Sequence, residues 1–298
     1  MTIPTASRVW KLRSQSMTIG PIPLVMGIVN VTPDSFSDGG RFSQTDAAIE
    51  HALHLADQGA SILDVGGEST RPYSTPVDVD EELQRVIPVI QGIVKNTKLP
   101  VSIDTSKSAV AAAAIQAGAE IINDVTGLEG DPNMLKVALK SGAGICAMHM
   151  QGNPQTMQDN PHYSDVVDEI REYLEQRKTW LLNAGIELEK ICLDPGIGFG
   201  KTHEHNFQLI RKCEAFLDLG CPILIGHSRK GFIGKIVDGP PSQPSYSEAE
   251  KLSNRDAGTL AITLLLARKG IPIIRVHEVG KTVAALKMQN AMGKTMGK

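Results

Sequence analysis

The sequence lacks a surplus of charge of either sign, because 30 lysines and arginines stand against 33 aspartates and glutamates. A chain this close to neutrality gives no electrostatic reason to expect nucleic acid or a membrane surface as a partner. The chain also lacks a long uncharged apolar run, which excludes a transmembrane helix. Residues 1–16 lack the continuous apolar core of a signal peptide. Together these absences predict a cytoplasmic protein.

Cysteine is scarce as well, and none of the residues has the CxxC spacing of a metal or redox site. The chain contains four, namely Cys146, Cys192, Cys213 and Cys221. Three of them lie inside or beside apolar runs, so we expect buried, reduced thiols rather than disulfide bonds or a zinc site.

What the sequence does contain is a repeated pairing of glycine with a short apolar run. Five segments show it: QGASILDVGG (58–67), AGAEIINDV (117–125), SGAGICAMHM (141–150), LGCPILIGHS (219–228) and KGIPIIRVHE (269–278). The glycine near the start of each suits the left-handed position that ends a helix. The aliphatic run after it is typical of a parallel strand covered on both faces. Three further runs fit the same role: LVMGIVN (24–30), PVSID (100–104) and ICLD (191–194).

Amphipathic segments with helical spacing lie between these runs. In one of them, Leu83, Val86 and Ile90 fall at positions i, i+3 and i+7. Another opens with Asp131-Pro132, where we expect a capping residue followed by a proline in the first helical position. Eight strands alternating with helices predict an α/β fold, a (β/α)8 TIM barrel, which commonly needs about 250 residues. An open doubly wound sheet is the alternative that local patterns leave open.

The predicted barrel spans residues 24–298 as a single domain and follows an N-terminal lead-in of residues 1–23. Long polar loops follow the first and second strands, and the Pro/Ser-rich stretch 238–247 predicts a further surface loop. Active sites of this fold lie at the carboxyl ends of the strands. Nearly every predicted strand here ends in a polar or charged residue, which a merely structural barrel would not need.

Three strand ends carry groups that suit a heterocycle. Asp104, Asn123 and Asp194 each close an apolar strand, so all three can project into the mouth of the barrel. Two carboxylates and a carboxamide can pair with a flat ring that presents an N–H edge and a carbonyl. Any one of them could instead cap the helix that follows. For three strand ends together we favour ligand binding.

The glycine-rich segment DPGIGFGKT (194–202) nearly matches a phosphate-binding P-loop. Pro195 replaces its first required glycine and has no N–H to offer a phosphate. We therefore do not expect a nucleotide hydrolase. The glycines are interpreted instead as letting the backbone and Phe199 approach a ligand closely.

Two segments can place cations or hydrogen-bond donors at the mouth. In GHSRKG (226–231), Arg229 and Lys230 follow an apolar run, and we expect Lys230 to reach into the barrel. In IIRVHE (273–278), Arg275 and His277 alternate, so both side chains point to the same face of the strand. That face must be the mouth, because a buried unpaired arginine is very costly. Such a pair suits an anion, of which phosphate is the common one.

The remaining candidates have ordinary explanations. The loop MGIVNVTPDSFSDGG (26–40), which becomes polar at Asn30, lacks the spacing of a calcium-binding EF-hand loop. His51 and His54 fall on a predicted helix surface. His203 and His205 have no further ligand at a recognised metal-site spacing.

Taken together, these segments resemble the dihydropteroate synthase family. MGIVNVTPDSFSDGG is similar to its first loop signature, and GGESTRP to its second. DPGIGFGK and SRK are similar to its motifs at the sixth and seventh strands, and SIDT, INDV, AMHMQG and RVH complete the set. The motifs run in family order from residue 26 to residue 277, so neither chance nor a shared barrel explains them.

The resemblance implies a transferase of folate biosynthesis that condenses (7,8-dihydropterin-6-yl)methyl diphosphate with 4-aminobenzoate, giving 7,8-dihydropteroate and pyrophosphate. It also implies Mg²⁺ as cofactor, these two small molecules as partners, a homodimer, and a target of sulfonamides. The residues that match the pterin site are Asp104, Asn123, Met148, Asp194, Lys230 and Arg275. Those that match the diphosphate site are Asn30, Arg71, Arg275 and His277, with Asn30 also the magnesium ligand. Those that match the aminobenzoate site are Thr70, Pro72, Phe199 and Ser228. The implied catalytic residues are Lys230, Asp104, Arg71 and His277.

Two positions depart from the family pattern. The second loop continues as Pro72-Tyr73-Ser74-Thr75, where many members have Pro-Gly-Ala, and Gly231 stands where serine or arginine is frequent. The first departure leaves the detailed shape of the aminobenzoate pocket open, though not the reaction.

Two other functions are the alternatives. A pterin-binding methyltransferase barrel would share the Asp-Asn-Asp face but has no use for the NVTPDSFSDGG, STRP or SRK segments. A catalytically silent paralogue that only binds a partner should have lost Lys230, Arg71 or Asn30, and none is lost. For the implied reaction, the negative charge that develops on the leaving pyrophosphate and the positive charge left on the pterin favour a largely dissociative substitution. Such a reaction needs no protein nucleophile.

Overall fold

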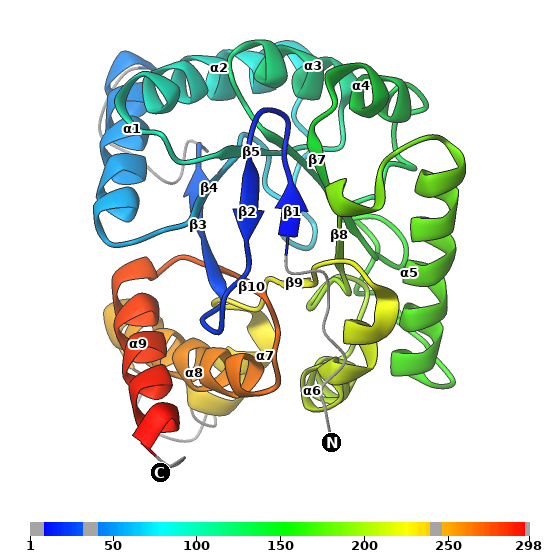
Figure 1. Ribbon diagram of the computed structural model, residues 1–298. Helices are drawn as coiled ribbons and strands as arrows, with labels where there is room; N and C mark the ends of the chain where they lie inside the picture. The colour runs from blue at the N-terminus through cyan, green and yellow to red at the C-terminus, as the bar shows by residue number, and fades with distance from the viewer. Residues whose placement is uncertain (1–8, 32–40, 239–245, 296–298) are drawn as a thin grey trace.

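The computed structural model describes residues 9–31, 41–238 and 246–295. Eight parallel strands form one sheet that curls into a barrel (Figure 1), in the order β8-β7-β6-β5-β4-β3-β10-β9. A bridge between Leu193 and Ile223 joins its two ends. The strands are β3 (Leu24–Asn30), β4 (Ile62–Gly66), β5 (Val101–Asp104), β6 (Ile121–Asp124), β7 (Gly144–Met148), β8 (Ile191–Asp194), β9 (Leu224–Ile225) and β10 (Ile273–Val276). The predicted (β/α)8 barrel is confirmed, and the open sheet is wrong.

Helices surround the barrel and connect each strand to the next (Figure 1). They are α1 (Arg41–Asp57), α2 (Val79–Asn96), α3 (Ser108–Gln116), α4 (Met134–Ser141), α5 (Val166–Asn183), α6 (His203–Arg211), α7 (Gly231–Val237), α8 (Glu248–Arg268) and α9 (Val279–Thr295). The glycines predicted to end helices all have a positive φ, namely Gly59, Gly118, Gly142, Gly220 and Gly270. In the described parts of the chain, no helix is both long enough and apolar enough to cross a membrane. Most of the predicted first loop, residues 32–40, and residues 239–245 of the predicted surface loop lie outside the described residues.

The barrel separates two apolar layers, because successive residues of a strand point to opposite faces. On β4, Leu63 and Val65 pack outward with the helices, whereas Ile62 packs inside the barrel. The inner cluster also contains Met26, Ile121, Cys146, Cys192, Leu224 and Ile273. The next inward residue of β4 is Asp64, which is also fully buried. The interior therefore changes from apolar to polar along its axis, and the polar end lies at the carboxyl ends of the strands.

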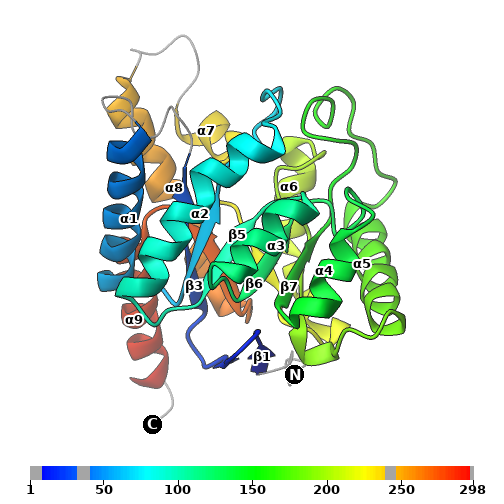
Figure 2. The ribbon, with the colours of Figure 1, turned by 90° about the horizontal axis from the view of Figure 1, so that it is seen from above.

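The opposite end of the barrel is closed by a hairpin of β1 (Val9–Lys11) and β2 (Ser16–Thr18), which Figure 2 shows at the bottom. Trp10 is fully buried in the inner cluster, and its Nε1 donates to the carbonyl of Lys190 at 3.0 Å. The backbone N–H and the hydroxyl of Ser14 both donate to the carboxylate of Glu120. Within the predicted lead-in, residues 9–18 thus plug the barrel, while residues 1–8 lie outside the described chain.

One helix start differs from the prediction. Helix α4 begins at Met134, after the Asp131-Pro132 pair, so proline is not its first residue. The carboxylate of Asp131 accepts from the backbone N–H of Asn133 at 2.9 Å and of Ser108 at 2.8 Å. Because Ser108 is the first residue of α3, Asp131 also satisfies a donor of the neighbouring helix. That contact joins residues 23 apart in sequence, which a local capping rule does not consider.

We expect Trp10→Ala to lower the free energy of unfolding by about 3–5 kcal/mol, the usual cost of deleting a buried aromatic side chain. The second of the chain's two tryptophans is the matched control, because Trp180 on α5 is 39% exposed. It stacks on Arg177, a contact worth about 0.5–1 kcal/mol at an exposed site. Urea denaturation followed by circular dichroism measures both losses. Equal losses would contradict a structural role for the hairpin.

Candidate active site

An arginine held between two carboxylates lies in the polar end of the barrel. Nε of Arg275 on β10 is 2.6 Å from Oδ2 of Asp64 on β4, and its Nη2 is 2.8 Å from Oδ2 of Asp104 on β5. Nδ2 of Asn123 on β6 donates to the same Asp64 oxygen at 3.1 Å. These four residues form one connected set, which we call the mouth network.

Asp64 is the member of the mouth network that sequence reasoning missed. It lies inside the apolar run ILDVGG, two residues before the end of β4, and its exposure is 0%. The available signal was the charge itself, because a carboxylate inside an apolar strand is costly unless it is paired. Its partner Arg275 is 211 residues away, so the sequence alone did not supply the pair.

The carboxyl group of Asp104 is partly neutral near pH 7. Burial raises its pKa to about 7, Arg275 acts in the opposite direction, and the charge of Asp64 adds to the rise. Helix capping was the alternative role for this residue. The start of α3 is instead served by the side chains of Thr105 and Asp131, so Asp104 faces the mouth.

Asp194 closes β8 next to Met148 on β7. Its Oδ1 accepts from the backbone N–H of Gly196 at 2.7 Å. Burial raises its pKa to about 6, while that hydrogen bond and then the charge of Lys230 lower it. Gly196 has a φ of +70°, and a Cβ there would lie 1.9 Å from the carbonyl oxygen of His149. Only glycine allows the loop to pass so close to the end of β7.

The lysine of the glycine-rich loop contacts the protein itself. Lys201 is 2% exposed, and its Nζ lies 2.8 Å from the carbonyl oxygen of Phe199 and 3.0 Å from Nδ1 of His149. Burial lowers its pKa well below the ordinary value. This amine fastens the loop to the end of β7, which is not the phosphate-binding role of a P-loop lysine.

Two adjacent cations, Arg229 and Lys230, follow β9, and of these Lys230 lies in the mouth. Its Nζ is 3.7 Å from the centre of the Phe199 ring, a cation–π contact. Burial lowers its pKa to about 7, and the charge of Asp194 opposes that change. Arg229 points elsewhere and forms an ion pair of 2.6 Å with Asp256 of α8.

His277 and Ser228 contact each other at the rim. Ser228 Oγ lies 2.9 Å from Nδ1 of His277 and accepts from its backbone N–H at 3.3 Å. Burial is the main reason that the pKa of the imidazole falls to about 3. Neighbouring cations act in the same direction, namely Arg229, Arg275, Arg71 and Lys230. The ring is therefore neutral near pH 7 and acts as a hydrogen-bond donor rather than as a cation.

The loop after β4 carries three predicted site residues, Thr70, Arg71 and Pro72, of which Arg71 and Pro72 are exposed. Its base is fixed by Glu68, which accepts from Nζ of Lys107 at 2.6 Å and from the backbone N–H of Val77 at 3.0 Å. Lys107 also pairs with the buried carboxylate of Glu82 on α2, at 2.5 Å. The two ends of the loop are thus tied together, and the tip stands above the rim.

Tyr73, at the departure from the family pattern, has a φ of 63°, a conformation that is costly for residues other than glycine. Its backbone N–H donates to the carbonyl of Pro154 at 3.1 Å, and its hydroxyl donates to Asp159 at 3.0 Å. The loop after β4 is therefore hydrogen-bonded to the loop after β7.

Asn30 ends β3 and pairs in register with Gly66 on β4, next to Asp104 on β5. It is half-buried. Within residues 9–31, 41–238 and 246–295, no three His, Cys, Asp or Glu side chains come together as a metal site.

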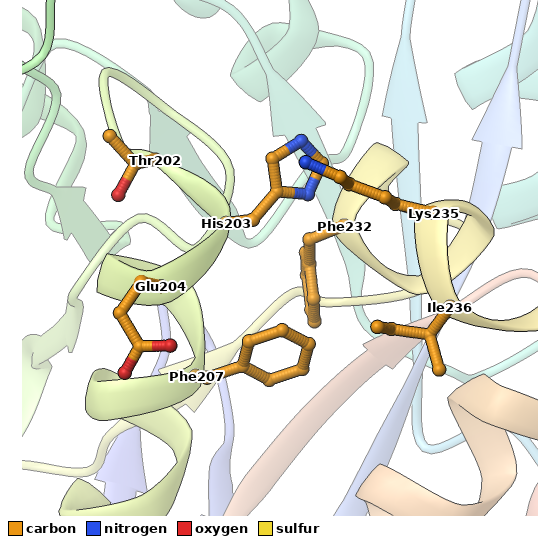
Figure 3. Close-up of a pocket in the computed structure, with 7 residues that line it drawn as sticks. All are labelled: Thr202, His203, Glu204, Phe207, Phe232, Lys235 and Ile236. Atoms are coloured by element: carbon orange, nitrogen blue, oxygen red, sulfur yellow. The ribbon is translucent and has the colours of Figure 1, made fainter.

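A separate hollow of about 400 Å³ lies on the outside of the barrel, between α6 and α7 (Figure 3). Phe207 and Phe232 meet there edge to face, with ring centres 5.3 Å apart. The other lining residues are Thr202, His203, Glu204, Lys235 and Ile236. None of them is a predicted site residue, so this hollow is distinct from the mouth.

The raised pKa of Asp194 predicts a pH-dependent stability. An acid whose pKa rises on folding, here to about 6, contributes stability below its unfolded pKa and loses it as the pH rises through the folded value. Asn cannot ionise. Relative to the parent, Asp194→Asn should therefore gain on the order of 2–3 kcal/mol between about pH 4 and pH 7. Denaturant titrations across this range measure the gain, and a difference independent of pH would contradict it.

Comparisons with known proteins identify the family of this chain. The model of the family described as pterin binding enzyme matches residues 26–277. The dihydropteroate synthases of Escherichia coli (strain K12) and Bacillus subtilis (strain 168) are 45% and 44% identical to this chain. Each comparison covers 90% of this chain, with 91% and 88% of the respective relative.

Solved structures give the same result. The Yersinia pestis dihydropteroate synthase, in a complex with a sulfonamide drug, has a TM-score of 0.86 at 39% identity and covers 96% of this chain and 99% of its own. The Xanthomonas albilineans dihydropteroate synthase in complex with 7,8-dihydropteroate has a TM-score of 0.83 at 40% identity, with 96% and 98% covered. The family match runs from within β3 to the residue after β10 and contains all four residues of the mouth network. This chain belongs to the pterin-binding enzyme family and, within it, to the dihydropteroate synthases.

Proposed function

We propose that this chain condenses (7,8-dihydropterin-6-yl)methyl diphosphate with 4-aminobenzoate, giving 7,8-dihydropteroate and pyrophosphate. The observation that carries the proposal is the mouth network, which together with Asp194 and Lys230 lines the polar end of an otherwise apolar barrel. The relative solved with 7,8-dihydropteroate supports the same substrate class. The reaction is a transfer of a pterinylmethyl group to an arylamine.

The pterin lies among the strand ends in this proposal. The carboxylate of Asp194 accepts from the N–H edge of the ring, Asn123 and Asp104 pair with its other polar atoms, and Lys230 donates to its carbonyl. Burial of these groups supports the assignment, because polar atoms removed from water need hydrogen-bond partners. Met148 packs beside the ring, and Arg275 stacks on it.

The diphosphate lies at the rim, against side chains of Asn30, Arg71, Arg275 and His277. The charge of Arg71 contributes to the low pKa of His277, which supports placing both near the same anion. Ser228 accepts from the backbone N–H of His277 and so can donate to its Nδ1. This arrangement leaves the hydrogen on Nε2, where the neutral ring can donate to a phosphate oxygen.

Magnesium fits the donor set at Asn30. A carboxamide oxygen is a hard ligand, and Mg²⁺ commonly uses one or two protein ligands while keeping water and phosphate oxygens. When bound there, the ion would neutralise negative charge on the diphosphate.

The aminobenzoate lies between the loop after β4 and the glycine-rich loop. Thr70 and Pro72 form one wall, and Phe199 and Ser228 form the other. The contact of Phe199 with Lys230 supports this placement, because it sets the ring directly beside the proposed pterin site.

The charges of the site favour a largely dissociative substitution. The bond from the methylene carbon to the diphosphate oxygen breaks first, and Arg71, Arg275 and His277 stabilise the negative charge that leaves. The electron-rich pterin ring spreads the positive charge that remains, and ionised Asp104 stabilises it. The arylamine nitrogen then forms a bond to the carbon and loses a proton to water. No protein nucleophile is needed.

The two alternative functions have less support. Neither relative described above is a methyltransferase, since both are dihydropteroate synthases. A silent paralogue would not need Lys230 in contact with the Phe199 ring or His277 bonded to Ser228.

We further propose that the chain works in the cytoplasm as a homodimer. Buried free cysteines, as in Cys146 and Cys192, suit a reducing compartment. Exposed apolar side chains on adjoining helices, Ile236 on α7 and Leu252 on α8, supply surface that an interface could cover.

The function is tested by mixing the protein with magnesium, the pterin diphosphate and labelled 4-aminobenzoate. We expect labelled dihydropteroate. Lys230→Met should lower kcat/KM by about 10²–10³-fold, as loss of one donor in an active site often does. The thermal midpoint should stay or rise, because a charge is removed from a half-buried position in the active site. The exposed Lys212→Met is the control. If Lys230→Met keeps most of the activity, its role is wrong.

Ordered binding is a second expectation of this site. Arg71 stands on an exposed loop tip, where the diphosphate would give it an anion to contact, so the second pocket should be completed after the pterin diphosphate binds. A sulfonamide should bind weakly to the free protein and much more tightly with pyrophosphate and magnesium. Arg71→Ala should remove most of that enhancement, and Arg211→Ala should not. Calorimetry decides, and equal affinity with and without pyrophosphate would refute the order.

A further inference from the structure

We propose that Asp64 is a positioning residue for the reaction, one that acts by fixing the orientation of both Arg275 and Asn123. The inference rests on the proposed function. It concerns a residue one layer below those assigned to the substrates, so Asp64 acts through its neighbours rather than by touching a substrate.

The first support is the geometry around Arg275. A guanidinium is planar and carries its five N–H groups in a rigid fork. Asp64 accepts from Nε, and Asp104 accepts from Nη2, at 2.6 and 2.8 Å. Two carboxylates on neighbouring strands therefore hold two different edges of one plane. With Asp104 alone, the side chain could turn about that single contact.

The second support is the contact with Asn123. The same Oδ2 of Asp64 accepts from Nδ2 of Asn123 at 3.1 Å. This bond assigns the two ends of the amide, since a carboxylate can accept but not donate. The amide nitrogen faces Asp64, and the carbonyl oxygen faces the other way as an acceptor. One buried carboxylate thus sets both the plane of the arginine and the polarity of the amide.

The burial of Asp64 distinguishes a positioning role from a role in packing alone. Asp64 is 0% exposed, and in the described parts of the chain its Oδ1 has no hydrogen-bond partner. The hydrogen bonds of this side chain therefore go to Arg275 and Asn123. A side chain that only filled space would not need an ionisable group at a position where an unpaired charge is so costly.

Asp64 also affects the titration of Asp104. Its charge raises the pKa of that carboxyl group, while Arg275 lowers it. The charged or titratable groups that act on Asp104 are Arg275, Asp64, Glu82, Asp124 and Lys230. Removing the charge of Asp64 would lower the pKa of Asp104. The pH at which kcat/KM rises should therefore move to a lower value, because this profile reports groups of the free enzyme.

The test compares Asp64→Asn with the parent in the dihydropteroate assay across pH. We expect kcat/KM to fall by about ten- to a hundredfold, which is the range for one hydrogen bond to a charged group. Its acid limb should move to lower pH. Ser102→Ala is the matched control, because Ser102 is a fully buried polar residue paired in register with Asp64, and it should leave both quantities unchanged.

A second comparison uses the Arg275→Gln background. There, adding Asp64→Asn should cost less than it does in the parent, because the contact with Arg275 is already lost and only the contact with Asn123 remains to be removed. In the double variant neither member of the Asp64–Arg275 ion pair is left charged without the other, so this comparison remains informative if Asp64→Asn alone does not fold. Suppose that the parent is active but Asp64→Asn does not move the acid limb, or that its effect is fully additive with that of Arg275→Gln. Either result would overturn this inference and leave the proposed function intact. A parent that forms no dihydropteroate would overturn the proposed function and this inference with it.

Discussion

The two ion pairs of Arg275, with Asp64 and with Asp104, hold the polar end of the barrel together. The guanidinium lies between Asp64 and Asp104, whose like charges would otherwise repel inside a low-dielectric interior. Burial lowers the pKa of Arg275, but the charges of Asp64 and Asp104 outweigh that effect and raise it above its ordinary value, so the guanidinium stays charged. Because Asn123 joins the same set through Asp64, one arginine connects three further strands. The orientation of the proposed substrate contacts follows from this pairing.

Burial brings the titrating groups of the site toward neutrality. The pKa values of Asp104 and Asp194 rise to about 7 and 6, while those of Lys230 and His277 fall to about 7 and 3. Acids and bases thus change in opposite directions for the same reason, since water is excluded from both. An enclosed site of this kind responds strongly to a charged ligand. A bound diphosphate would favour the cationic form of Lys230, whose pKa lies near 7.

The two ends of the barrel divide stability from chemistry. At the amino ends of the strands, the hairpin places Trp10 in an apolar cluster whose burial stabilises the fold. At the carboxyl ends, buried charged groups such as Asp64 and Asp194 are costly positions that the rest of the fold must offset. The glycine-rich loop is held in place by a buried group of this kind. Lys201, whose spacing first suggested a phosphate site, fastens that loop to the end of β7.

Features that depend on residues close together in the sequence were predictable from the sequence alone. Glycine stops, apolar runs and polar strand ends predicted the barrel, and runs such as 24–30 and 191–194 match β3 and β8. Which side chains contact one another depends on the tertiary structure. The start of α4 depends on Asp131, which serves two helices, and the choice of Lys230 for the mouth leaves Arg229 with Asp256. Asp64 was missed because its partner comes from a strand 211 residues away. A buried charge is defined by its partner, and closure of the barrel supplies that partner.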